Sequence, residues 1–257
     1  MSVFPDGSID PRRWKTFENL ALFGSVSSSN DLARELIELY FTEDQPLPST
    51  VFVTEAQTAA RGRKGQWAAP RGRGVYLTFV RKAPPGEPIS LVPIAVGRWV
   101  RETLVEAAGL EASLKWPNDV YAGGRKLAGI LAESRTQGED TYVAVGLGLN
   151  VLGSSDALGV EGATTVEQET GRAPDLAALL QALLDRFDRE LASPGWEEEV
   201  GRWERVALHR PGDRLTVRRE GEELSGEYRG LTREGFLRLG TAAGGETVVA
   251  VGELARW

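Results

Sequence analysis

The 257-residue sequence contains no cysteine, one methionine and a single histidine, His209. Without cysteine the chain can form no disulfide, no thiolate metal site and no cysteine nucleophile. One histidine excludes a multi-histidine metal centre, and a Ser-His-Asp triad would have to run through His209. We expect His209 instead to be a surface or inter-domain residue.

The sequence also lacks an excess of positive charge and long hydrophobic runs. Its formal net charge is −7, which argues against a general nucleic-acid-binding protein. The first residues, MSVFPDGSIDPRRW, lack the apolar core of a signal peptide, and no apolar run is long enough to cross a bilayer. We therefore expect a cytoplasmic protein that binds neither nucleic acid nor membrane.

The pattern of apolar and turn-forming residues predicts an α+β chain of two domains. Strands are expected at 15–24, 50–54, 75–80, 112–116, 127–133 and 141–147, and helices after Ser28 and at 89–108, 175–192 and 196–206. Beyond residue 208, short alternating strands separated by Gly-containing turns are typical of a small SH3-like β-barrel. The predicted domains are residues 1–207 and 208–257, and no helix-turn-helix module is expected before them.

A loop of alternating arginine and glycine occupies 61–65, with the sequence RGRKG, and is followed closely by Trp67. Glycine lets a backbone approach a ligand, arginine neutralises phosphate, and an indole offers a flat apolar surface. An RNA-binding Arg/Gly segment or a plain solvated loop would have a similar composition. The flanking strands and the acidic remainder of the chain favour a lid over a small-molecule site.

A second segment, KWPNDVYAGGRKLAGILAES, runs from Lys115 to Ser134. Asn118 and Asp119 can bind backbone groups while presenting an acid, and Lys126 begins an apolar strand. A lysine near a core-facing site is costly unless it pairs with an anion. In isolation, however, Gly-Arg-Lys is more typical of an ordinary lysine at a strand edge.

A third segment, GLGLN, ends a predicted strand at Asn150 and contains Gly146 and Gly148. Its glycine spacing does not meet the dinucleotide-binding pattern GxGxxG, and the phosphate-binding loop GxxxxGK[ST] is absent from the chain. These two common nucleotide-binding patterns are therefore excluded. Together the three segments still indicate a site for an anionic ligand such as a nucleotide.

In the order ARGRKGQW, KWPNDVY, GRKLAGILAES and GLGLN, the segments resemble the biotin–protein ligases, also called biotin–[acetyl-CoA-carboxylase] ligases. The eleven-residue step from Lys115 to Lys126 matches that family. The resemblance covers nearly the whole chain and points to the monofunctional form, without an N-terminal DNA-binding domain. It implies a central mixed β-sheet with flanking helices, like a class II synthetase catalytic domain, followed by the SH3-like barrel.

The resemblance implies a two-step reaction that uses ATP, biotin and Mg²⁺. Biotin and ATP first form biotinyl-5′-AMP and pyrophosphate. Biotin is then transferred to a lysine of a biotin carboxyl carrier protein, or of the carrier domain of a biotin-dependent carboxylase. A homodimer is compatible with the resemblance, as is a monomer.

The same resemblance assigns roles to individual positions. The expected catalytic residues are Lys126, at the biotin carboxylate and α-phosphate, Arg61, in the loop over the ligands, and Asp119, which would position the incoming lysine amine. The expected biotin-binding residues are Ser28, Ser29, Asn30, Gln57, Arg61, Lys126, Gly129 and Leu131. The expected ATP- or adenylate-binding residues are Arg63, Trp67, Lys126 and Asn150, and Asn150 is also the expected Mg²⁺ contact.

The sequence departs from the family pattern at three places. Ser27 stands where the family usually has aspartate, Ala60 where it has glycine, and the loop before Trp67 is one residue shorter, with Gln66 near a common arginine position. Two other functions agree less well with the sequence. A lipoate– or octanoate–protein ligase shares the lysine but carries a histidine-containing motif absent here, and a non-catalytic RNA-binding module leaves Lys115 to Lys126 unexplained.

Overall fold

The computed structural model describes residues 3–4, 7–62, 65–219, 221–241 and 244–257. The strands are β1 (Asn19–Phe23), β2 (Thr50–Thr54), β3 (Arg61–Gly62), β4 (Gly65–Gln66), β5 (Gly74–Lys82), β6 (Ser113–Lys115), β7 (Asp119–Ala122), β8 (Arg125–Gln137), β9 (Asp140–Asn150), β10 (Arg214–Arg219), β11 (Glu222–Leu231), β12 (Leu237–Gly240), β13 (Glu246–Val249) and β14 (Glu253–Arg256). The helices are α1 (Ser29–Thr42), α2 (Val92–Ala108), α3 (Ser155–Leu158), α4 (Val166–Thr170), α5 (Leu176–Ala192) and α6 (Trp196–Arg205), with 3₁₀ turns at Pro11–Arg13 and Ile89–Leu91.

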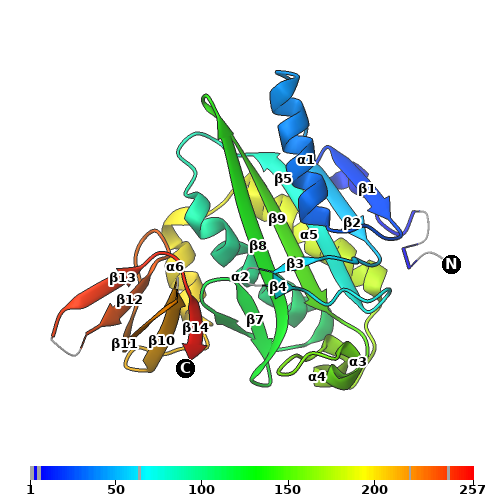
Figure 1. Cartoon of the computed structure of the whole chain (residues 1–257). Helices are drawn as coiled ribbons and strands as arrows, with labels where there is room; N and C mark the ends of the chain where they lie inside the picture. Colours follow the sequence, from blue (N-terminus) through cyan, green and yellow to red (C-terminus); the bar gives the residue numbers. More distant parts are fainter. Residues whose placement is uncertain (1–2, 5–6, 63–64, 220, 242–243) are drawn as a thin grey trace.

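Most strands belong to two separate sheets (Figure 1). Within the described residues, a seven-stranded sheet has the order β1-β2-β5-β9-β8-β7-β6, and a five-stranded sheet has the order β13-β12-β11-β10-β14. In the larger sheet β1 runs parallel to β2 while the other neighbours are antiparallel. This mixed sheet and the antiparallel C-terminal sheet confirm the predicted fold class.

Both faces of the larger sheet are covered by helices: α1 lies over one face, and α2 and α5 lie over the other (Figure 1). The alternation of strand side chains explains the arrangement. Val51 and Val53 of β2 belong to the core that includes α2 and α5, whereas Phe52 between them packs with Ala33 and Ile37 of α1. All five residues of β2 are therefore buried, which is why the sequence predicts its limits so closely.

The helix signals in the sequence also correspond to observed ends. Ser28 caps α1, its side chain accepting a hydrogen bond from the Asp31 backbone N at 3.3 Å. Gly109 ends α2 in the left-handed region, at φ 63°, where glycine is favoured. Asp175 caps α5 by accepting hydrogen bonds from two backbone N–H groups.

The expected strands at 112–116 and 127–133 are not consecutive. Strand β7 lies between them, and Pro117 and Asn118 form the turn from β6 to β7. Asp119 is therefore the first residue of a strand, paired with Gly129 of β8. β7 has only four residues and gains its stability from pairing with β6 and β8, so local sequence gave little sign of it. The loop at 61–66 likewise forms a short hairpin, β3–β4.

The two sheets are joined at the β6–β7 hairpin. Leu114 of β6 exchanges backbone hydrogen bonds with the connecting segment, accepting from Leu208 N at 2.7 Å and donating to Val206 O at 2.9 Å. Trp116 Nε1 donates to Gly235 O of the C-terminal part at 3.0 Å. The boundary at 207/208 remains a proposal, and it falls in the segment between α6 and β10.

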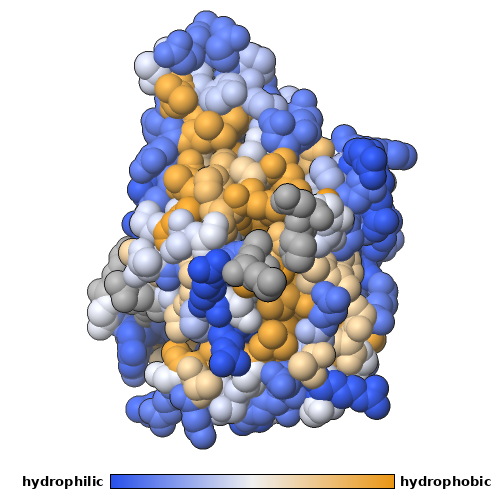
Figure 2. Space-filling view, turned by 90° about the vertical axis from the view of Figure 1, so that its right-hand side faces the viewer, coloured by the Kyte–Doolittle hydropathy of each residue, from blue (hydrophilic) through white to orange (hydrophobic). Residues whose placement is uncertain are grey.

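Figure 2 shows the side of the molecule on which β1 lies, where hydrophobic residues gather in the middle of the face between polar margins. Leu22 of β1 and Leu39 of α1 are among the large apolar side chains that remain exposed. β1 also ends the strand order of the larger sheet. None of the helices in the described residues is long and apolar enough to span a bilayer.

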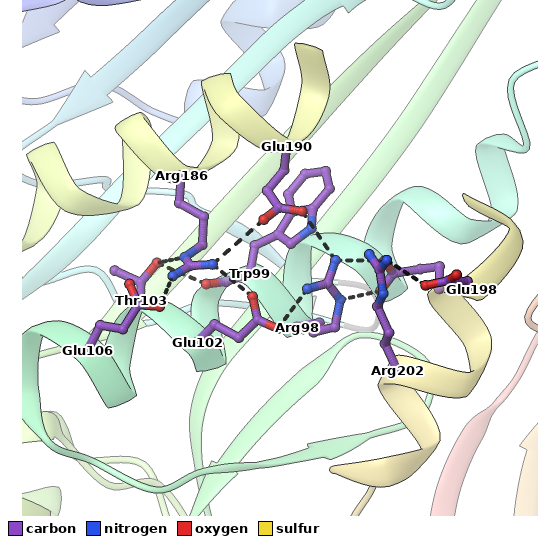
Figure 3. A network of polar contacts seen from close by, with 10 residues as sticks. Arg98, Trp99, Glu102, Thr103, Glu106, Arg186, Glu190, Glu198 and Arg202 are labelled. Atoms are coloured by element: carbon purple, nitrogen blue, oxygen red, sulfur yellow. Dashed lines mark hydrogen bonds and ion pairs between the residues drawn. The ribbon is translucent and has the colours of Figure 1, made fainter. Parts of the chain in front are cut away.

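A buried ionic network links α2, α5 and α6 (Figure 3). Arg98 makes a two-pronged contact with Glu199, with Nε–Oε1 at 2.7 Å and Nη2–Oε2 at 2.8 Å. Glu102 bridges Arg98 and Arg186 at 2.7 and 2.8 Å. The Arg98 and Glu199 side chains are only 5% and 2% exposed, so each charge depends on its partner.

Replacement of Glu199 by alanine should lower the free energy of unfolding by about 3–5 kcal/mol, because it leaves the Arg98 guanidinium buried without its main partner. Urea denaturation measures this loss. The adjacent Glu198 pairs with Arg202 but is 74% exposed, so Glu198→Ala should cost less than about 1 kcal/mol. Equal effects of the two substitutions would contradict the assignment.

Candidate active site

Two adjoining cavities lie where the β3–β4 hairpin approaches β8. The first cavity has a volume of about 450 Å³ and the second a volume of about 360 Å³. Trp67 and Lys126 line both of them. A ligand pair could therefore occupy the two cavities with its reacting atoms meeting beside Lys126.

The sequence-predicted residues surround these cavities. Those that line the first cavity are Ser28, Ser29, Asn30, Gln57, Arg61, Trp67, Asp119, Lys126, Gly129 and Leu131. Asn150 lines the second cavity, together with Trp67 and Lys126. Arg63 lies outside the described residues, and its role stays a prediction.

A chain of hydrogen bonds fixes the polar side chains of the first cavity. Gln57 Oε1 accepts from the Ser29 backbone N at 2.7 Å. Ser29 Oγ lies 2.7 Å from Thr78 Oγ1, which in turn donates to Asn30 Oδ1 at 2.8 Å. Thr78 is fully buried on β5, and sequence reasoning missed it because a lone strand threonine carries no distinguishing pattern.

Asn30 lies directly against Gly146 of β9. An added Cβ at Gly146 would stand 1.9 Å from Asn30 Oδ1, so only glycine leaves room for the amide. On its other side, Asn30 Nδ2 donates to Leu131 O and to Glu133 Oε2, both at 3.3 Å. The first glycine of GLGLN is thus explained by the position of Asn30.

The second glycine of GLGLN makes room for Trp67. Gly148 pairs with Gly129 across β9 and β8. An added Cβ would lie 2.6 Å from the Trp67 ring at Gly148 and 3.1 Å from it at Gly129. The indole therefore lies against a surface of two facing glycines, between the two cavities.

Lys126 is held where the cavities meet. Its Nζ lies 2.7 Å from Asp119 Oδ1 on the neighbouring strand and 5.4 Å from the centre of the Trp67 ring. Its backbone is fixed as well: Lys126 N donates to Gly162 O at 2.8 Å, and Lys126 O accepts from Thr164 N at 2.9 Å. The side chain is 34% exposed, so the ammonium remains accessible from the cavities.

Arg61 reaches the first cavity from the short hairpin. Its Nη1 lies 3.0 Å from Asp31 Oδ1, and Arg34 contacts the same carboxylate oxygen at 2.8 Å. Asp31 thus supplies an acidic group near this cavity, although Ser27 occupies the position where the family usually has aspartate. At 46% exposure, the Arg61 side chain is free enough to exchange this partner for a ligand.

Asn150 lies at the end of β9, where its Nδ2 donates to Thr164 O at 3.1 Å. Its side chain is buried, with 4% exposure. No group of three or more acidic or histidine side chains able to hold a metal occurs among the described residues. Among the described residues, a metal ion near Asn150 would therefore be offered an amide oxygen and no cluster of carboxylates.

The C-terminal sheet contributes residues to both cavities, which sequence reasoning did not anticipate. Arg218, Arg219, Val251, Gly252 and Glu253 line the first cavity, and Trp257 lines the second. Strand alternation indicated that a small β-domain would form. It gave no sign of which edge would face the other domain.

A cluster of aromatic rings surrounds Lys115 behind the second cavity. Lys115 Nζ lies 3.4 Å from the centre of the Trp257 ring and 3.5 Å from Tyr121 Oη. Burial lowers the pKa of Lys115 to about 8, against the opposing effect of Asp119. Burial, reinforced by the Lys115 charge, also lowers the pKa of His209 to about 4. His209 is thus an inter-domain residue, and the surface alternative is wrong.

The model of the biotin/lipoate A/B protein ligase family matches residues 23–150. A biotin–[acetyl-CoA-carboxylase] ligase of Paracoccus denitrificans is 34% identical over 209 residues, covering 76% of this chain and 85% of that protein. The chain belongs to this family, among its biotin protein ligases. A Mycobacterium tuberculosis biotin–[acetyl-CoA-carboxylase] ligase is 30% identical over 252 residues, covering 92% of this chain and 86% of that one.

The fold of this ligase is similar to a biotin protein ligase of Aquifex aeolicus solved in complex with biotin and ATP. The TM-score is 0.72 and the sequence identity 27%, over 93% of this chain and 98% of the other. The similarity spans both sheets, so the C-terminal sheet belongs to the shared architecture.

The imidazole of His209 should stay neutral down to about pH 4, because its burial next to the Lys115 ammonium disfavours the charged form. NMR can follow this titration without ambiguity, since the chain has one histidine. In the unfolded chain the group takes up its proton near pH 6.5, so stability should fall as the pH drops from 6.5 towards 4. His209→Phe should weaken this fall between pH 6.5 and 5, and an NMR pKa near 6.5 would contradict the assignment.

Proposed function

We propose that this chain forms biotinyl-5′-AMP from biotin and ATP and then transfers biotin to a lysine of a biotin carboxyl carrier protein or domain. The observation that carries this proposal is the meeting of two cavities at Lys126. Biotin would occupy the first cavity and the nucleotide the second. Because the reaction consumes ATP, we propose that the protein acts in the cytoplasm.

In the first step the biotin carboxylate attacks the α-phosphate, so two anions must come together. A cation held at their meeting point offsets their repulsion and stabilises the charge that develops in the transition state. Lys126 has the required position, and Arg61 can leave Asp31 to bind the same anions. The β3–β4 hairpin and Trp67 would limit the access of water to the mixed anhydride.

The polar groups of the first cavity favour biotin over lipoate or octanoate. A ureido ring presents two N–H donors and one carbonyl acceptor, whereas a dithiolane ring or an alkyl chain presents none. Gln57, Ser29 and Asn30 bring amide and hydroxyl groups together at this cavity, fixed by Thr78. With an apolar ligand these buried polar groups would lose hydration without compensation.

We propose that Mg²⁺ arrives bound to the triphosphate. Mg²⁺ commonly keeps several waters and uses substrate phosphates together with one or two protein oxygens. The Asn150 side chain fits this use because the residue lines the second cavity and its nitrogen is engaged by Thr164, so its amide oxygen would be the group that contacts the ion. The ion would neutralise phosphate charge there.

In the second step the lysine amine of the carrier attacks the biotinyl carbonyl and AMP leaves. The amine must lose a proton to become a nucleophile, and a carboxylate close to the reacting carbon can position it and accept that proton. Asp119 lines the first cavity beside Lys126. We therefore assign Asp119 to the transfer step, in addition to its contact with Lys126.

Replacement of Lys126 by alanine should lower biotin-dependent ATP–pyrophosphate exchange by at least about 10²-fold, because the charge at the meeting point is lost. The chain should remain folded, as circular dichroism can verify. Lys82, an exposed lysine paired with Asp140 at a distant strand end, provides the control Lys82→Ala. Exchange at the wild-type rate in the Lys126 variant would refute the role of Lys126. If the wild type exchanged with lipoate and not with biotin, the chain would be a lipoate–protein ligase.

The substitution Asp119→Asn should slow the transfer of biotin from preformed biotinyl-5′-AMP to a carrier domain by about 10²-fold or more. Single-turnover transfer measured against pH separates this effect from adenylation. If Asp119 acts on the amine, the variant should respond to rising pH more steeply than the wild type, since free amine becomes limiting. An unchanged transfer rate would remove Asp119 from the second step.

A further inference from the structure

The C-terminal sheet presents unusual apolar surface towards the cavities. The large apolar side chains that remain exposed in the described residues are Leu22, Leu39, Val160, Val248, Val251 and Trp257. Val160 and Trp257 line the second cavity, and Val251 lines the first. Exposed apolar groups that gather around a cavity are commonly covered when its ligand binds.

Trp257 is the largest of these groups and follows strand β14. It is 52% exposed, yet its ring is held firmly. Lys115 Nζ lies 3.4 Å from the ring centre. The Tyr121 and His209 rings meet it edge-on, with centroid distances of 5.9 and 6.3 Å and interplanar angles of 84° and 71°.

These contacts do not bury the indole. Lys115 covers one face, and Tyr121 and His209 are close to perpendicular to the ring. Since half of the residue is still accessible and lines the second cavity, part of the indole remains accessible to a ligand. A flat ring oriented in advance loses little conformational freedom when another ring stacks on it.

The remaining lining of the second cavity suits a nucleoside. Leu158, Val160 and Ala163 provide apolar surface, while Lys126 and Asn150 provide polar groups at the end where the phosphates would lie. A volume of about 360 Å³ falls within the range of small-molecule sites. The cavity lining therefore combines apolar and aromatic surface, including Trp257, with the charged groups of Lys126 and Glu161.

We propose that Trp257 of the C-terminal domain stacks on the purine ring of the nucleotide and is a specificity-determining residue for ATP. This inference rests on the proposed function, since it takes the second cavity as the nucleotide site. The active site is then built from both domains. The catalytic domain supplies Lys126, and the C-terminal domain supplies the aromatic surface for the base.

A purely structural role for Trp257 would have different consequences. If the indole only covers Lys115, its removal should disturb the domain junction and weaken all anionic ligands of the cavity together. If it stacks on the base, its removal should weaken only those ligands that carry a base. Inorganic tripolyphosphate, which has the phosphates without the nucleoside, separates these two roles.

The experiment compares Trp257→Ala, Trp257→Phe and the wild type in biotin-dependent ATP–pyrophosphate exchange at saturating biotin. Because the alanine variant loses the stacking of the base on an aromatic ring, its KM for ATP should rise roughly 5- to 150-fold. The phenylalanine variant should recover most of this loss. The KM of biotin, the rate at saturating ATP and inhibition by tripolyphosphate should all stay within about twofold. Val248→Ala, which removes an exposed apolar group of the same domain away from both cavities, is the matched control.

An unchanged KM for ATP in Trp257→Ala would overturn the inference, and so would equal weakening of ATP and tripolyphosphate. The failure of the proposed function would look different, because the wild type itself would then show no biotin-dependent exchange. Thermal unfolding of the alanine variant, with and without tripolyphosphate, supplies a second measurement. If that variant still unfolds cooperatively and tripolyphosphate stabilises it as it does the wild type, the phosphate site is intact. A loss of ATP affinity then results from the lost contact between the indole and the base.

Discussion

The contact between Lys126 and Asp119 is the interaction on which the site depends. A cation beside a cavity with apolar walls needs a counter-charge while no anionic ligand is present. The pairing of β7 with β8 brings Asp119 to 2.7 Å from the ammonium. The contact orients the lysine, which still lines both cavities. The segment between α3 and α4 fixes the backbone of Lys126 as well, through hydrogen bonds at Gly162 and Thr164.

Close packing of the sheet against a few side chains prepares the remaining site. Gly146 admits Asn30, and Gly148 with Gly129 admits Trp67, each because a methyl group would collide. The glycines of GLGLN therefore bring side chains close to the sheet, and no phosphate need touch them directly. This differs from glycine-rich nucleotide loops, in which the backbone itself approaches the ligand. Thr78 completes the arrangement by linking Ser29 to Asn30 inside the sheet.

Local sequence was informative where one segment determines its own environment. The fully buried run of β2, the Ser28 cap of α1 and the glycine that ends α2 each have a short-range physical cause. The order of the motifs pointed to the family, and every site residue that it indicated within the described part of the chain lines one of the cavities. β7, Thr78 and Trp257 were not identified because their importance comes from neighbours distant in sequence: a strand on each side, a buried network, and the face that one domain turns towards the other. Arg63 stays a prediction, since it lies outside the described residues.

The backbone links at β6 also bear on how ligands reach the site. The backbone of Leu114 forms two hydrogen bonds with the segment that connects the two sheets. The Trp116 side chain donates a third hydrogen bond to Gly235 O on the other side of the junction. A hinge that swung the small domain away would have to break buried hydrogen bonds with no water at hand to replace them. These bonds hold the C-terminal residues that line both cavities in place beside the larger sheet, so a ligand meets cavity walls that are already assembled.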